Sequence, residues 1–234
     1  MMWMQTFTDR KMDVTNPDDA PIDFLEIAIV LARIYRYTGH TSRPFSVAQH
    51  CVIGHDALRS KFPDRPDIAL AFLLHDAHEA YTGDISTPIQ NALGVFAWAP
   101  LEDALADRGL DTDAWHTWTN QVAPEIINAA FKEMKRRLDV VIFKAAGANF
   151  PMDPDVKAEV RSMDRIMLVT ERRDLMGPSP GSWGEYDEAT PLNQTIYPWQ
   201  RHVAAQRWLS RLETYTGETH RAAPAKADWD WQDV

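Results

Sequence analysis

The chain has almost no cysteine: Cys51 is the single one among its 234 residues. One thiol cannot form an intrachain disulfide, and so low a cysteine content is typical of proteins from a reducing compartment. The chain also lacks an apolar run of ~18 residues, which a membrane-spanning helix needs, and it lacks the charged-then-apolar start of a signal peptide. We therefore expect a cytoplasmic protein with no membrane partner, in which Cys51 is a packing residue.

Positive charge is scarce as well. The 24 Lys and Arg residues face 34 Asp and Glu residues, so the formal net charge is −10. Binding to a phosphate backbone needs clustered Lys and Arg, so we expect no stable nucleic-acid binding. A small anionic substrate stays compatible with this balance, because a local arginine pair or a metal can outweigh the overall field.

The sequence shows no sustained strand pattern, because no segment keeps a period of two. Apolar residues recur instead at helical spacing, and 45% of the residues are hydrophobic, enough for one sizeable core. The expected helices cover residues 22–35, 47–61, 67–81, 124–146, 155–175 and 198–215, with a short one after Thr87. The predicted fold class is all-α, with one domain over residues 1–216 that contains an insertion at 94–123. Residues 217–234 are expected to form a mobile, acidic tail.

Local signals predict where two of these helices begin. Ser46 is followed three residues later by Gln49, a capping-box pattern that predicts a helix start at Val47. Pro124 fits the first turn of a helix, and Gly147 fits its end.

The chemistry-bearing segment is His75-Asp76-Ala77-His78-Glu79, which directly follows an apolar run. Adjacent His and Asp side chains are costly to bury without a partner, and a divalent metal ion is the usual one. On a helix, His75 and Asp76 could reach one ion, and Glu79 would stand a turn further on beside it. A carboxylate there suits general acid/base catalysis on metal-bound water. The alternative is a satisfied core histidine beside a surface carboxylate, because single His-Asp dipeptides are common by chance.

Three further features favour the metal. His50 lies on the preceding helix, and antiparallel packing could bring it to the same ion. Asp84 follows in the segment 82–88 and adds a carboxylate at the helix end. Asp164 sits in an otherwise apolar helix stripe, where an unpaired carboxylate would cost several kcal/mol and a metal would supply the partner.

With these residues in this order, the chain resembles the HD-domain metal-dependent phosphohydrolases. It is most similar to the small bacterial 5′-deoxynucleotidases and the phage dATP triphosphohydrolases. The resemblance extends over residues 22–212 apart from 94–123. It is carried by the segments RIYRYTGHT at 33–41, SVAQH at 46–50, LHDAHEAYTGD at 74–84 and MDRIMLVTERRDLM at 163–176.

The resemblance implies a single helical HD-domain bundle with a metal site in its core. It implies that the metal ligands are His50, His75, Asp76 and Asp164. Glu79 matches the residue that transfers a proton, and Asp84 matches the one that contacts the sugar 3′-hydroxyl. The expected cofactor is a divalent ion (Co, Mn, Zn, Fe or Mg), the substrate is a small-molecule nucleotide, and the protein is expected to be a homo-oligomer.

Phosphate recognition needs further positive charge. Arg33 and Arg36 at the first helix are candidates, because a planar guanidinium can hold two phosphate oxygens. Their alternative is a solvated helix end. Arg161 lies three residues before Asp164 on the same helix face and could reach a phosphate beside the metal. In the phage triphosphohydrolases that the chain resembles, a phosphate-binding lysine is expected where this chain has Gln90. The resemblance therefore does not imply a preference for triphosphates.

The expected function is therefore hydrolysis of phosphate esters or anhydrides of (deoxy)nucleotides, by a 5′-nucleotidase or a dNTP (dATP) phosphohydrolase. The alternatives are hydrolysis of cyclic nucleotides or of a guanosine alarmone, and a non-catalytic nucleotide-binding domain stapled by the metal. A helical DNA-binding module is disfavoured by the net charge. His78 falls on a different helix face from His75 and Asp76, so we expect it to pack or to support a ligand. His55 has no partner that the sequence indicates.

Overall fold

The protein is mostly helical in a computed structural model, which describes residues 2–17, 21–96, 99–109 and 113–218. The helices are α1 (Phe24–Arg33), α2 (Val47–Lys61), α3 (Pro66–Leu74), α4 (Glu79–Thr82), α5 (Thr87–Phe96), α6 (Ala99–Ala106), α7 (Asp113–Ala145), α8 (Pro154–Leu175) and α9 (Arg201–Thr216). Two short 3-10 helices, η2 (Arg36–Gly39) and η3 (Gly184–Glu188), interrupt the loops. The predicted all-α class is confirmed. Residues 219–234, which hold most of the predicted tail, lie outside the described residues.

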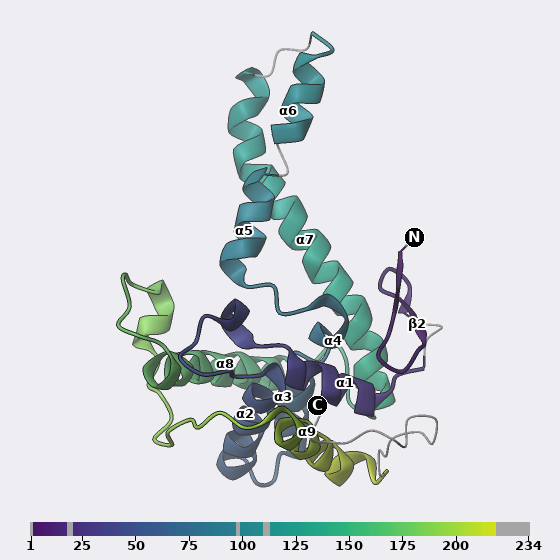
Figure 1. The fold of residues 1–234 in the computed structure, drawn as a ribbon, viewed down its shortest axis with the longest axis vertical. Helices are drawn as coiled ribbons and strands as arrows, with labels where there is room; N and C mark the ends of the chain where they lie inside the picture. Colours follow the sequence, from purple (N-terminus) through teal and green to yellow (C-terminus); the bar gives the residue numbers. More distant parts are fainter. Residues whose placement is uncertain (1, 18–20, 97–98, 110–112, 219–234) are drawn as a thin grey trace.

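The body of the molecule is a bundle around α2 (Figure 1). Helix α2 packs against α3 and α9, α1 packs against α9, and α8 packs against α3. Large, fully buried apolar side chains fill this core, among them Phe45, Phe72 and Trp208. This packing brings together α2, α8 and the C-terminal end of α3, the three parts of the chain that carry the predicted metal ligands.

Helix α2 begins and ends at the predicted residues, but only half of its capping box forms. The Ser46 side chain accepts a hydrogen bond from the Gln49 backbone amide at 3.2 Å, as expected for an N-cap. The Gln49 side chain does not return this bond. It donates to the carbonyl of Tyr197 at 2.8 Å and accepts from the amide of Trp199 at 2.8 Å. Gln49 therefore ties α2 to the segment that precedes α9.

The helix predicted over 67–81 is wrong as a single element. Helix α3 ends at Leu74 and α4 begins at Glu79, and a turn with the shorter i→i−3 bonding joins them, such as the Glu79 amide to the Asp76 carbonyl at 3.0 Å. The cause is local: the carbonyl of Phe72 accepts from Nδ1 of His75 at 2.6 Å, and this bond competes with the helical one. The turn re-aims His75 and Asp76 relative to a straight helix.

The prediction that Pro124 starts a helix is also wrong, because α7 begins at Asp113 and continues through it. An interior proline loses one backbone hydrogen bond, which local rules penalise. Helix α5 packs against α7. Together with α6, these helices form an arm that projects from the body (Figure 1), so the described residues within 94–123 are largely helical. Gly147 ends α7 with φ +70°, as predicted.

A small hairpin near the N-terminus was not predicted. Strands β1 (Trp3–Gln5) and β2 (Lys11–Asp13) pair antiparallel, with Met4 opposite Met12. Three-residue strands are too short to show a period of two, which explains why the pattern missed them.

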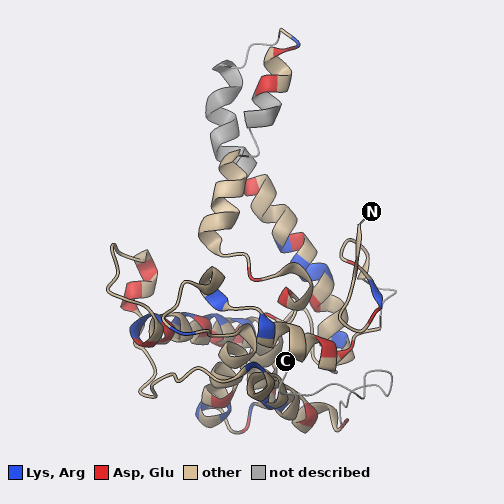
Figure 2. Cartoon of the chain, viewed as in Figure 1, with Lys and Arg blue, Asp and Glu red and all other residues tan. Residues whose placement is uncertain are grey.

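None of the helices in the described part of the chain is long and apolar enough to cross a membrane. In Figure 2, basic and acidic residues are interspersed along the helices of the body.

Candidate metal centre

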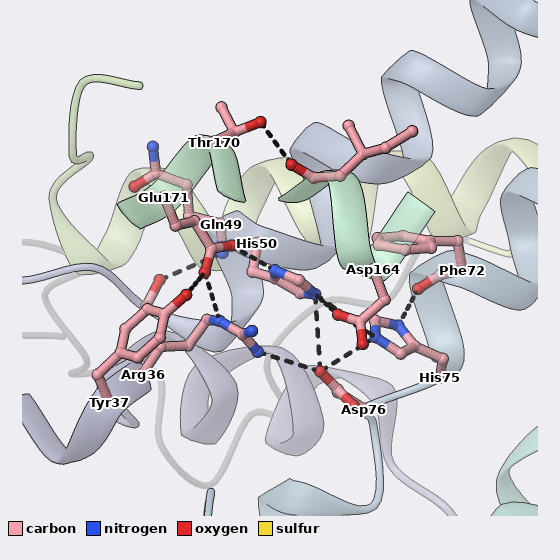
Figure 3. A network of polar contacts seen from close by, with 12 residues as sticks. Arg36, Tyr37, Gln49, His50, Phe72, His75, Asp76, Asp164, Thr170 and Glu171 are labelled. Atoms are coloured by element: carbon pink, nitrogen blue, oxygen red, sulfur yellow. Dashed lines mark hydrogen bonds and ion pairs between the residues drawn. The ribbon is translucent and has the colours of Figure 1, made fainter. Parts of the chain in front are cut away.

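The four predicted ligands meet at one point in the core of the bundle (Figure 3). His50 comes from α2, Asp164 from α8, and His75 and Asp76 from the turn between α3 and α4. Nε2 of His50 lies 3.4 Å from Nε2 of His75, 3.8 Å from Oδ2 of Asp76 and 3.4 Å from Oδ1 of Asp164. Nε2 of His75 lies 3.1 Å from Oδ2 of Asp76 and 3.9 Å from Oδ1 of Asp164.

The hydrogen bonds on the far side of each imidazole decide which nitrogen faces this point. Nδ1 of His75 lies 2.6 Å from the carbonyl oxygen of Phe72, which can only accept, so Nδ1 carries the proton. Nδ1 of His50 lies 2.6 Å from Oε1 of Glu171 and donates to it in the same way. Both Nε2 atoms are then free to act as ligands, which is the usual arrangement of a metal-binding histidine.

These groups could hold a cation between them. Two nitrogen lone pairs and two carboxylates repel one another at these distances unless a proton or a metal lies among them. Burial lowers the pKa of His75, but the charge of Asp76 and the contact with it outweigh burial and hold that pKa well above its ordinary value. Ligand atoms of His50, His75 and Asp76 lie within 4.8 Å of one another. Two imidazoles and two carboxylates suit a first-row divalent ion, so the residues fit the expected cofactor.

Glu171 is a part of the site that the sequence reasoning did not assign. Its fully buried carboxylate accepts from Nδ1 of His50, from Nε of Arg36 at 3.0 Å and from the hydroxyl of Tyr37 at 2.6 Å. Glu171 stands seven residues after Asp164, which places both on one face of α8. That spacing was the available signal.

Arg36 lies at the site but is already paired. Its Nε contacts Glu171, and its Nη1 lies 3.5 Å from Oδ2 of Asp76. It belongs to η2 and not to the first helix, which ends at Arg33. Tyr37, the next residue, has φ +58°, a left-handed conformation that is uncommon for a residue with a side chain. The hydroxyl bond to Glu171 holds Tyr37 there.

The other two predicted phosphate ligands lie elsewhere. The guanidinium of Arg33 stacks 4.8 Å from the ring centroid of Phe7, in the N-terminal segment. Arg161 is exposed on α8, one turn before Asp164, whose side chain is 48% exposed. The site is therefore open to solvent on the side of α8, and contact of either arginine with phosphate stays a prediction.

Glu79 is the first residue of α4 and is buried beside the ligands. Burial raises its pKa well above the ordinary value, and the charges of Asp76 and Asp84 add to the effect. Burial also raises the pKa of Asp84, with Arg36 opposing. A carboxyl group with a raised pKa can act as a general acid, which is compatible with the expected role of Glu79.

Comparison with known proteins places the chain in a family. No family model matches it. It is 31% identical over 196 residues to the uncharacterized protein YfdR of Escherichia coli strain K12, and the alignment covers 83% of each chain. The chain belongs to the YfdR family. It is also 32% identical over 106 residues to the uncharacterized protein RCAP_rcc00048 of Rhodobacter capsulatus, covering 44% of this chain and 54% of that relative.

Two further histidines in this YfdR-family chain have partners that the sequence did not indicate. Nδ1 of His78 lies 2.9 Å from Oδ1 of Asp139, which comes from α7. His55 lies between Asp56 and the hydroxyl of Tyr215, each at 2.8 Å. Cys51 is fully buried, as predicted, and burial raises the pKa of its thiol to about 11.

Proposed function

We propose that the protein is an HD-domain phosphohydrolase that cleaves phosphate esters or anhydrides of (deoxy)nucleotides with a divalent metal ion. One observation carries the proposal: four side chains from three parts of the chain converge, and both imidazoles hydrogen-bond through Nδ1 and turn Nε2 to the shared point. A structural core histidine does not need this arrangement. The ligands would be His50, His75, Asp76 and Asp164.

The donor set admits Co, Mn, Zn, Fe or Mg as the ion. When bound, such an ion supplies positive charge for a phosphoryl oxygen and lowers the pKa of a coordinated water. Glu171 keeps His50 in the ligating tautomer. Arg36 balances Glu171 and Asp76, and it also orients Asp76.

Glu79 holds and moves the proton in this proposal. It is buried, and its Oε2 has no hydrogen-bond partner within the part of the chain that the structure describes. Its neighbour Asp84, also with a raised pKa, would accept from or donate to a sugar hydroxyl. Arg161, exposed on α8 one turn before Asp164, would meet a phosphate that enters from that side.

The decisive experiment is a nucleotide panel with purified, metal-loaded protein. The panel contains deoxynucleoside monophosphates and triphosphates, cyclic nucleotides and a guanosine alarmone. We expect phosphate or tripolyphosphate release from a deoxynucleotide, and which of the two appears separates the 5′-nucleotidase from the dNTP phosphohydrolase. Glu79→Gln should lower kcat by about 10²–10⁴-fold, whereas Glu185→Gln, which changes an exposed carboxylate, should not.

Unchanged turnover in Glu79→Gln would remove the proposed role of Glu79. Tight nucleotide binding without turnover under every metal would favour the non-catalytic, metal-stapled domain. We also expect a homo-oligomer, as in the proteins that the chain resembles, which light scattering on the eluting protein would test.

A further inference from the structure

Two buried polar atoms next to the proposed metal centre lack a partner. His78 and Glu79 are 5% and 4% exposed. Nε2 of His78 and Oε2 of Glu79 are fully enclosed, and neither has a hydrogen bond within the part of the chain that the structure describes. An unsatisfied buried polar group costs about 1–3 kcal/mol. Two such groups on adjacent residues indicate a common partner.

Asp76 forms a set of three with these two residues. Asp76, His78 and Glu79 each place one ligand atom so that the three lie within 4.8 Å of one another. Ligand atoms that share one ion at about 2.0–2.2 Å lie about 3–4 Å apart, so small side-chain movements would close this set on a cation. The set also includes a residue of the first centre, because Asp76 belongs to both.

His55, a structural histidine of the same protein, provides a comparison for the hydrogen bonds of His78. It is 4% exposed, and like His78 it places Nδ1 against an aspartate, Asp56, at 2.8 Å. Its Nε2, however, lies 2.8 Å from the hydroxyl of Tyr215, so both nitrogens are satisfied. His78 has Asp139 on Nδ1 and no protein partner on Nε2. A metal-binding histidine typically donates one ring nitrogen to a carboxylate and leaves the other nitrogen free for the metal.

Acidic side chains gather at the two centres. Asp139 contacts His78, Asp84 lies beside Glu79, and Asp76, Asp164 and Glu171 surround the first centre. Such a concentration of carboxylates favours a cation among them.

We propose that Asp76, His78 and Glu79 form a second divalent-cation site, which shares Asp76 with the first and is oriented by Asp139. One imidazole nitrogen and two carboxylate oxygens suit a first-row ion such as Mn²⁺. The inference rests on the proposed function for the first ion. His78 is then a ligand and not the packing or supporting residue that its helix face predicted. Oε2 of Glu79 faces this ion, and Oε1, which is not among the enclosed atoms without a partner, remains for proton transfer.

The test is the number of Mn²⁺ ions bound per chain, measured by equilibrium dialysis and elemental analysis on the full chain. We expect two for the wild type, one for His78→Gln and one for His50→Gln, which removes a ligand of the first site only. His55→Gln is the matched control and should retain two. In electron paramagnetic resonance, a shared carboxylate should couple the two ions in the wild type, and His78→Gln should abolish that coupling.

Asp139→Asn gives a second, milder test, because it removes only the charge behind His78. It should weaken the second Mn²⁺ by about 10–100-fold and leave the first unchanged. If His78→Gln does not fold, Asp139→Asn still tests whether the second site exists. One ion in both the wild type and His78→Gln, or unchanged affinities in Asp139→Asn, overturns the second site while the first stands. No bound ion in any metal-loaded form rejects the proposed function as well.

Discussion

Nδ1 of His50 lies 2.6 Å from Oε1 of Glu171, and both side chains are fully buried. This bond holds His50 in the tautomer that leaves Nε2 free. The same carboxylate also binds Arg36 and Tyr37. Glu171 therefore supports the candidate metal centre without lying at its open face.

Glu171→Gln should keep the fold and weaken metal binding. The amide has a similar shape and can still accept from His50, but it no longer carries the charge that makes the imidazole a better ligand. We expect about 10–100-fold lower metal affinity by titration calorimetry. Glu171→Ala should instead cost about 3–5 kcal/mol in urea unfolding, because it removes the buried carboxylate that Arg36, Tyr37 and His50 share. Metal affinity in Glu171→Gln equal to that of the wild type would contradict this account.

Metal should stabilise the folded chain through Asp164. At a free ion concentration 100 times the dissociation constant, binding adds about 2.7 kcal/mol, which appears as a higher melting temperature. Asp164→Asn should lose most of this rise and cost little without metal, because its side chain is 48% exposed. Asp155→Asn, at an exposed position of the same helix, is the control and should respond to metal like the wild type. An equal rise in Asp164→Asn would exclude Asp164 as a ligand.

Gly54→Ala should disturb the candidate metal centre by changing the core packing beside it. A Cβ at Gly54 would collide with the ring of Phe72, whose centroid lies 4.4 Å from that of the His75 ring. The backbone carbonyl of Phe72 also accepts the hydrogen bond from Nδ1 of His75. We expect a loss of about 1–3 kcal/mol in urea unfolding, together with weaker metal binding. Gly177→Ala meets no atom within 4 Å and serves as the control. Unchanged stability and metal affinity would show that Phe72 can move freely.

Asp56 gives a pH-dependent prediction away from the metal centre. Burial raises its pKa, but hydrogen bonds from His55 and Arg211 outweigh burial and lower the pKa from 3.8 to about 2. A lowered folded-state pKa means that the stabilisation is complete above about pH 4 and is lost as the pH falls toward 2.

Asp56→Asn should therefore destabilise the protein at pH 7 and progressively less as the pH falls from 4 to 3. The effect should stay at or below about 1 kcal/mol, because the Asp56 side chain is 46% exposed and solvent screens it. Urea unfolding at these pH values checks it against Asp64→Asn, an exposed aspartate. A difference between wild type and variant that grows at low pH would reverse the sign and refute the prediction.

Local sequence signals predicted both ends of helix α2, because Ser46 caps its start and its apolar face extends along its length. They failed where a distant partner decides the outcome. The Gln49 side chain serves Tyr197 and Trp199 and not its own helix start, and the helix through His75 breaks because its imidazole takes the Phe72 carbonyl. Neither competition is visible from spacing.

The sequence by itself determined the all-α class, from apolar residues at helical spacing, and the order of the four candidate ligands, which the resemblance supplied. Only the tertiary structure decided that Glu171 supports His50 across 121 residues of chain and that Asp139 supports His78 across 61. Helix formation depends on neighbours within a few residues, which spacing records. A buried carboxylate chooses its partner by three-dimensional proximity, because desolvation makes any nearby donor better than none, and that choice exists only once the helices have packed.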